Sequence, residues 1–124
     1  MEFLYEVYDW NETRPLALRI AQSAEEEAVV AVSSEGGLFE YGDDHAIVAN
    51  LKAMTAEGST APVVVGSVTS ADSIRRASIQ RQKFKLYPRM AGEFDGLARQ
   101  AGFATVKLLD TPLSYQVLLE RLAR

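Results

Sequence analysis

Cysteine is absent from this chain of 124 residues, so disulfide bonds, thiolate zinc sites and a cysteine nucleophile are excluded. Histidine occurs once, as His45, which excludes a metal site built from several histidines. No apolar run approaches the roughly 18 residues of a membrane-spanning helix, and the N-terminal stretch carries acids where a signal peptide needs basic residues. We therefore expect a cytoplasmic protein that holds no metal and does not associate with a membrane.

Nucleotide-binding and hydrolase motifs are missing as well. The only closely spaced glycines, Gly36 and Gly37, are adjacent and lack the G-x-G spacing through which a backbone approaches a nucleotide. The serines lack the G-x-S-x-G motif of a nucleophile elbow, and no histidine follows them in the order that a hydrolase triad needs. Asp43, Asp44 and His45 form a small cluster, but helix capping explains the two aspartates sufficiently.

Basic residues are scarce in the first half of the chain and acidic residues in the second. Residues 1–58 hold twelve acids against three bases, a net charge of −9, whereas residues 59–124 hold ten bases against five acids, a net of +5. Six bases follow one another between Asp72 and Glu93 with no acid among them. Nucleic acid is an unlikely partner for a chain of net charge −4, and we favour a solvated face lying against the acidic half.

The apolar residues, 48% of the sequence, suffice for the core of one domain over residues 1–124. Their runs and spacing predict both strands and helices. The predicted strands cover residues 3–8, 28–33, 62–68 and 105–109, and the predicted helices cover residues 13–26, 43–58 and 94–101. A short helix is also expected from Thr69, and an edge strand at 83–87.

The end of the chain allows two structures. Asp110 and Pro112 suit the start of a helix, but residues 115–119 equally suit a strand paired back on residues 105–109. The alternation of strands and helices predicts an α/β fold, with a mostly parallel, three-layer sheet and helices on both faces. An antiparallel strand pair at the C-terminus is compatible with this fold.

One segment resembles a known family. Residues 94–106 read FDGLARQAGFATV, which resembles the helix, A-G-F, strand signature near the end of class I methyltransferases that use S-adenosylmethionine. The resemblance covers most of this chain but only the C-terminal half of the family fold. It implies that residues 3–8 are the fourth of the family's seven strands, residues 28–33 the fifth, and the last two segments the final antiparallel pair. The family's glycine-rich cofactor loop and the acid after its second strand have no counterpart here.

Polar residues that follow two predicted strands form the candidate site, because ligands of α/β sheets bind at the carboxyl ends of strands. By the resemblance, these residues face the cofactor or the methyl acceptor. They are Asp9, Trp10, Asn11, Ser33, Ser34 and Glu35. Structural roles compete with this one, since Asp9 and Asn11 form turns, Trp10 suits a core and a loop glutamate such as Glu35 is usually solvated. Parallel pairing of the first two strands would place Trp10 beside Ser33, and no catalytic residue is assigned.

Two functions from different classes remain. The chain is either a partial S-adenosylmethionine-dependent methyltransferase that needs another chain for cofactor binding and methyl transfer, or a non-catalytic α/β binding or assembly module. A receiver-like domain is a third option, because Asp9 suits its acidic site, but Ser67 and Thr69 stand where that site needs an aspartate. By the resemblance S-adenosylmethionine is the cofactor, and tight binding by the isolated chain is not expected.

Strand edges predict association with another chain. The strand at 3–8 has one internal charge, Glu6, and the strand at 62–68 has none, so neither edge is protected against pairing. We expect a homodimer, formed by edge pairing or by exchange of an element, or a complementing protein chain.

Overall fold

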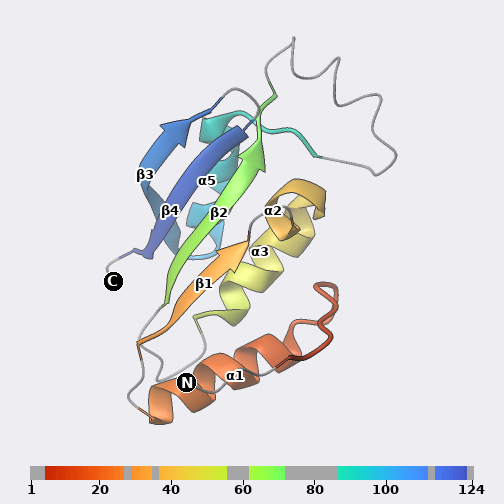
Figure 1. Cartoon of the computed structure of the whole chain (residues 1–124), viewed down its shortest axis with the longest axis vertical. Helices are drawn as coiled ribbons and strands as arrows, with labels where there is room; N and C mark the ends of the chain where they lie inside the picture. Colours follow the sequence, from red (N-terminus) through yellow and green to blue (C-terminus); the bar gives the residue numbers. More distant parts are fainter. Residues whose placement is uncertain are drawn as a thin grey trace.

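A four-stranded sheet organises the chain (Figure 1). The structure, a computed structural model, describes residues 5–26, 29–34, 37–55, 62–71, 87–111 and 114–122. In chain order the elements are α1 (Arg14–Glu25), β1 (Ala31–Ser34), α2 (Leu38–Tyr41), α3 (Asp44–Ala53), β2 (Val63–Thr69), α5 (Ala91–Gln100), β3 (Phe103–Asp110) and β4 (Ser114–Arg121). None of the described helices has both the length and the apolar composition that crossing a bilayer requires.

The strand order is β1-β2-β4-β3. β1 and β2 are parallel, whereas β4 is antiparallel to both β2 and β3. The prediction of a mostly parallel sheet is therefore wrong, although the α/β class is confirmed. The connection between β3 and β4 is too short for a parallel crossover, so β4 turns back between β3 and β2 and pairs antiparallel with each.

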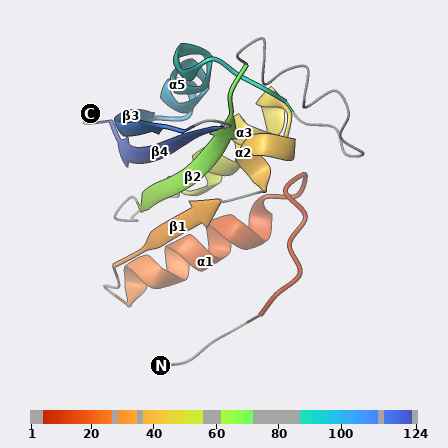
Figure 2. The ribbon, with the colours of Figure 1, turned by 45° about the horizontal axis from the view of Figure 1, so that its top comes forward.

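The helices gather on one face of this sheet. α2 contacts β2, α5 contacts β3, and α3 packs between α5 and α1. Figure 1 shows β4 passing in front of α5, and Figure 2 shows α1 running alongside β1, at the opposite side of the sheet from β3. The described residues thus form two layers, and they do not confirm the expected third layer of helices on the other face.

Most of the predicted elements are confirmed. The helices expected at 13–26, 43–58 and 94–101 are α1, α3 and α5, and the strands at 28–33, 62–68 and 105–109 are β1, β2 and β3. The ambiguous C-terminal segment is the strand β4, paired with β3. The helix expected after Thr69 and the edge strand at 83–87, apart from Tyr87 itself, lie outside the described residues.

The first predicted strand is wrong in its described part. Residues 5–8 belong to no strand, and Tyr5 and Val7 are 84% and 89% exposed. Aromatic and branched residues favour a strand only when a neighbouring strand supplies cross-strand contacts, and here they have none. The strand assignment that the resemblance implied is consequently shifted by one element. The two parallel strands that precede the antiparallel pair are β1 and β2, not residues 3–8 and β1.

The core lies between the sheet and the helices α2, α3 and α5. Phe39 and Phe94 meet edge to face, with ring centroids 4.9 Å apart, over the fully buried Val64 and Val68 of β2. Two helix-end features that the sequence predicted are present in α3 and α5, the helices that pack on this core. The Asp43 side chain caps α3 by accepting a hydrogen bond from Ala46 N at 2.8 Å, and Gly102 ends the turn after α5 with φ of 90°.

Asp95 ties α5 to the start of β3. Its carboxylate accepts a hydrogen bond from Arg99 Nε at 2.7 Å and another from the backbone N–H of Thr105 at 2.8 Å. These donors, Arg99 first, hold the pKa of the Asp95 carboxyl below its ordinary value. The A-G-F turn that suggested the family resemblance is thus fixed from both sides.

Gly66 is required by close packing between β2 and α2. A Cβ at this position would lie 2.5 Å from the Phe39 ring and 2.7 Å from the Ser34 carbonyl oxygen. We predict that Gly66→Ala lowers the free energy of unfolding by about 1–3 kcal/mol, because the buried Phe39 ring must shift.

Gly96→Ala is the matched control for this prediction. A Cβ there meets nothing within 4 Å, so alanine in helix α5 should raise stability by about 0.5–1 kcal/mol. Urea denaturation of both variants measures the difference, and equal stabilities would contradict the packing argument.

Candidate functional site

Polar side chains collect where β2 ends. Ser67, Thr69 and Ser70 are all at least nine-tenths buried, although the first part of the strand is valine. β1 is shorter than β2, and α2 lies beyond its carboxyl end, where Glu40 accepts a hydrogen bond from Ser67 Oγ at 2.7 Å. This end of the sheet is the candidate site, because the two parallel strands β1 and β2 both finish here.

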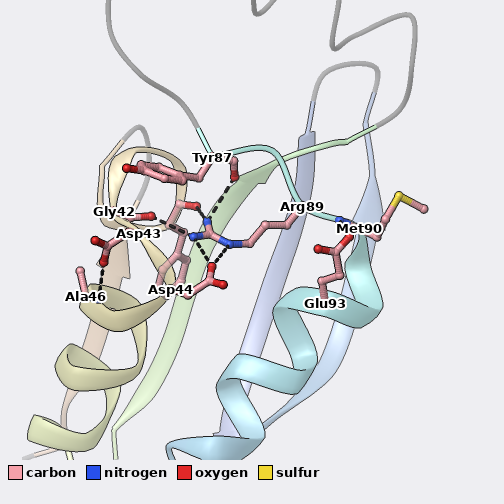
Figure 3. A network of polar contacts seen from close by, with 9 residues as sticks. Gly42, Asp43, Asp44, Ala46, Tyr87, Arg89, Met90 and Glu93 are labelled. Carbon is pink, nitrogen blue, oxygen red and sulfur yellow. Dashed lines mark hydrogen bonds and ion pairs between the residues drawn. The ribbon is translucent and has the colours of Figure 1, made fainter.

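Arg89 forms the centre of the site (Figure 3). Its side chain is buried, and its Nε and Nη2 donate to Asp44 Oδ1 at 3.1 and 2.9 Å. Nη2 also donates to Gly42 O at 2.9 Å, and Nη1 donates to the carbonyls of Phe39 and Tyr87 at 3.1 and 3.2 Å. These contacts use all five N–H groups of the guanidinium, so none is left for a phosphate or a carboxylate ligand.

Arg89 therefore positions chain segments. Its own backbone bridges to the chain at the end of β2, since Arg89 N donates to Thr69 O at 2.9 Å and Ala71 N donates to Arg89 O at 3.2 Å. Tyr87 N donates to Glu40 O at 2.9 Å, which fastens the same segment to α2. The sequence presented Arg89 only as one of a run of bases, and the rest of that run, from Arg75 to Lys85, lies outside the described residues.

The predicted site residues Ser33 and Ser34 lie at this end of the sheet. They pair with Val65 and Gly66 of β2, and Ser33 is exposed while Ser34 is half-buried beside Gly37. Glu35, predicted with them, lies outside the described residues. Of the five predicted residues that the structure describes, two therefore lie at the candidate site.

Asp9, Trp10 and Asn11 belong to a segment docked on α3. The buried amide of Asn50 donates to Trp10 O at 2.8 Å and accepts from Tyr8 Oη at 2.7 Å, while the Asp9 side chain accepts from Asn11 N at 2.9 Å in a turn. Burial raises the pKa of the Tyr8 phenol, and the nearby Asp9 and Glu12 raise it further. Because residues 5–8 form no strand, this turn does not end one, and its polar contacts go to α3 and not to Ser33 or Ser34.

Sequence reasoning missed Glu40 and Arg89 as members of the site. A usable signal was present in β2, whose apolar run VVVGSV changes to Thr69 and Ser70 at the carboxyl end. Buried hydroxyl groups require hydrogen-bond partners, so a polar element was to be expected above them. No local pattern shows that the partners come from α2 and from the segment at 87–90.

The chemistry available in the described residues is hydrogen bonding. No cluster of three or more histidine, aspartate or glutamate side chains in this part of the chain could hold a metal ion. Glu40 is engaged with Ser67, and Asp44 with Arg89. The described residues therefore form a polar, hydrogen-bonded surface at the end of the sheet. Among them no nucleophile is paired with a general base.

Similarity to known proteins is found in the fold and not in the sequence. No protein-family model and no curated protein matches the sequence. Among solved structures, the O-methyltransferase NcsB1 of neocarzinostatin biosynthesis, in complex with S-adenosylmethionine and 2-hydroxy-5-methyl naphthoic acid, matches with a TM-score of 0.56 and 24% identity over 73% of this chain and 28% of its own. The mitomycin 7-O-methyltransferase MmcR matches with a TM-score of 0.56 and 14% identity, over 89% of this chain and 40% of its own.

The chain has the fold of part of an O-methyltransferase. A pericyclic reaction enzyme also matches, with a TM-score of 0.61 and 12% identity over 94% of this chain and 29% of its own. This O-methyltransferase-like fold spans between about a quarter and two-fifths of the length of the matched proteins. The family resemblance of the sequence is thereby supported at the level of fold.

We predict that Arg89→Lys lowers the free energy of unfolding by about 2–3 kcal/mol, because lysine has three donors on a flexible stem and leaves buried carbonyls unsatisfied. Arg99→Lys is the control, since the Arg99 side chain is 56% exposed and its ion pair with Asp95 should be worth less than about 1 kcal/mol. Thermal and urea unfolding of both variants gives the comparison. Equal losses would show that the Arg89 contacts do not hold the fold.

Proposed function

We propose that this chain is a partial methyltransferase-type domain, which needs a second polypeptide for S-adenosylmethionine binding and methyl transfer. The observation that carries the proposal is the position of β1. It forms the edge of the sheet, and no described strand pairs with its outer side. The fold shared with O-methyltransferases, over 28–40% of their length, supports the same reading.

The outer side of β1 is able to extend the sheet. Val63 N donates to Val30 O at 3.2 Å, and in a parallel ladder the residues that face the partner strand alternate. Val32 and Ser34 therefore face β2, while the backbone groups of Ala31 and Ser33 point to the open edge. Ala31 and Ser33 are both exposed. A strand from a complementing chain could pair there once α1, which runs alongside β1 (Figure 2), is displaced.

The described residues do not fit the cofactor by themselves. The guanidinium of Arg89 has no free donor, Glu40 is bonded to Ser67, and the Asp43 carboxylate caps α3. The sequence also lacks the glycine-rich loop that the family uses. We therefore assign no step of methyl transfer to a residue of this chain, and place the cofactor contacts on the complementing polypeptide.

A non-catalytic assembly module is the second candidate. Three side chains on the face of the sheet away from α5 are apolar and exposed, namely Val63, Val65 and Leu109. They favour an assembly module, because exposed apolar surface of this kind marks association sites. Both candidates require a partner, and they differ in whether the assembled complex transfers a methyl group.

We predict that the isolated chain binds S-adenosylmethionine with a dissociation constant weaker than about 10 μM, that is, less favourably than roughly −7 kcal/mol. Isothermal titration calorimetry measures it, with an intact S-adenosylmethionine-dependent methyltransferase as the positive control. A dissociation constant of about 10 μM or tighter would contradict the need for a second polypeptide.

We further predict that the amides of Ala31 and Ser33 exchange with solvent at least about tenfold faster than those of Val32 and Ser34, because only the latter donate to β2. Hydrogen exchange followed by NMR resolves the four amides. Uniform protection along β1 would mean that its outer edge is already paired, and would remove the observation on which the proposal depends.

A further inference from the structure

We propose that residues 5–26 form a releasable cover over the outer side of β1, and that their detachment from α3 admits the strand of the complementing polypeptide. We call these residues the N-terminal cover. They comprise the segment that precedes Arg14 and the helix α1. This inference rests on the proposed function, because it concerns what controls access to the strand edge at which the second polypeptide would pair.

The N-terminal cover lies on the side of β1 that is away from β2. Figure 1 and Figure 2 both show α1 next to β1, beyond the last strand of the sheet. Leu16 of α1 and Val32 of β1 are half-buried and pack against the same hydrophobic core. The backbone groups inside a helix are bonded within the helix, so α1 blocks the edge of the sheet without extending the ladder of strands.

One side chain of α3 makes the polar attachment of the cover. Among the described residues, every hydrogen bond that joins the cover to the rest of the chain involves Asn50. Its buried amide accepts from Tyr8 Oη at 2.7 Å and donates to Trp10 O at 2.8 Å. On release, water can bond to the Tyr8 hydroxyl and the Trp10 carbonyl, so the net contribution of these two bonds is modest.

The cover is held together internally, so it can detach as one unit. An ion pair between Glu6 and Arg19 joins its first segment to the middle of α1. The turn before α1 is closed by Glu12 N, which donates to Asp9 O at 3.0 Å. Neither contact involves the sheet or α3, and neither has to break when the cover leaves them.

Little apolar surface fastens α1. Of its side chains that the structure describes, Ile20 alone is buried, Leu16 is half-buried and Leu18 is exposed. By contrast, α3 places Ile47 and Leu51 in the core, both fully buried. Elements with few buried apolar contacts open locally at a lower free energy than the core does. Detachment of the cover should therefore leave α3 and the sheet folded.

Hydrogen exchange followed by NMR tests the release in the full chain, with Tyr8→Phe as the variant. This change removes the hydroxyl that donates to Asn50. Tyr5→Phe is the matched control, because Tyr5 is 84% exposed and forms no hydrogen bond in the described part of the chain. A detached helix of 12 residues is marginal in water. We therefore expect the α1 amides to exchange about three- to tenfold faster in Tyr8→Phe, and those of β2 and β4 to be unchanged.

Access to the outer side of β1 is measured with a fluorescein-labelled peptide of sequence PVVVGSVT. This is the sequence of residues 62–69, which include β2 and pair parallel with β1. Because only the released state can bind, the affinity should rise with the released fraction. We expect Tyr8→Phe to bind the peptide about three- to tenfold tighter than the parent chain, and Tyr5→Phe to bind it like the parent chain.

Proline substitution identifies the edge at which the peptide pairs. Ser33→Pro removes an amide that points to the outer side of β1, so it should abolish binding, whereas Ser33→Ala should not. Ala31→Pro removes the other outward amide and gives the same test if Ser33→Pro does not fold. Circular dichroism of each variant shows whether it is folded.

Three results would overturn the proposal. The first is exchange in α1 that Tyr8→Phe leaves unchanged, or raises equally in β2 and β4, because the cover would then open only with the whole domain. The second is a peptide affinity that Tyr8→Phe does not increase, and the third is binding that survives the folded proline variant. No S-adenosylmethionine enters these measurements, so their failure leaves the proposed methyltransferase role to the cofactor titration.

Discussion

The buried guanidinium of Arg89 is the constraint on which this end of the molecule depends. It joins the segment that leads into α5 to the Phe39 carbonyl of α2 and to Gly42 in the turn before α3, which lie 50 and 47 residues away in the sequence. A buried cation is costly unless every donor is satisfied, and here carbonyl oxygens and one carboxylate satisfy all of them. The contacts hold α2 over the end of β1, and with it the Phe39 ring against Gly66.

The same contacts limit what the site can do. Polar groups at the carboxyl ends of parallel strands are the usual place for ligands, but in this chain most of them are occupied by one another. Glu40 is joined to Ser67, Asp44 to Arg89, and Asp43 to the start of α3. The polar side chains at this end of the sheet are therefore already hydrogen-bonded to one another. Groups that recognise a ligand or react with it must come from elsewhere.

Two surfaces remain available for that addition, and they differ in physical character. On the outer side of β1 no strand of the described residues pairs with the backbone, so another strand can extend the sheet there. The face of the sheet away from α2, α3 and α5 offers the exposed apolar side chains of Val63, Val65 and Leu109, which another packed surface can cover. Both arise because the helices α2, α3 and α5 cover a single face of a sheet whose strand order ends at β1.

The sequence by itself determined the local structure. The aspartate cap of α3, the glycine after α5 and the valine run of β2 lead to the predicted elements, because capping, backbone freedom and apolar spacing act over a few residues. Tertiary structure decided the rest. Residues 5–8 have strand composition but no strand to pair with, β4 pairs with β2 at a distance of some fifty residues, and Arg89 finds its partners through the fold. Pairing and burial depend on which segments meet in space, and no local pattern in one sequence carries that information.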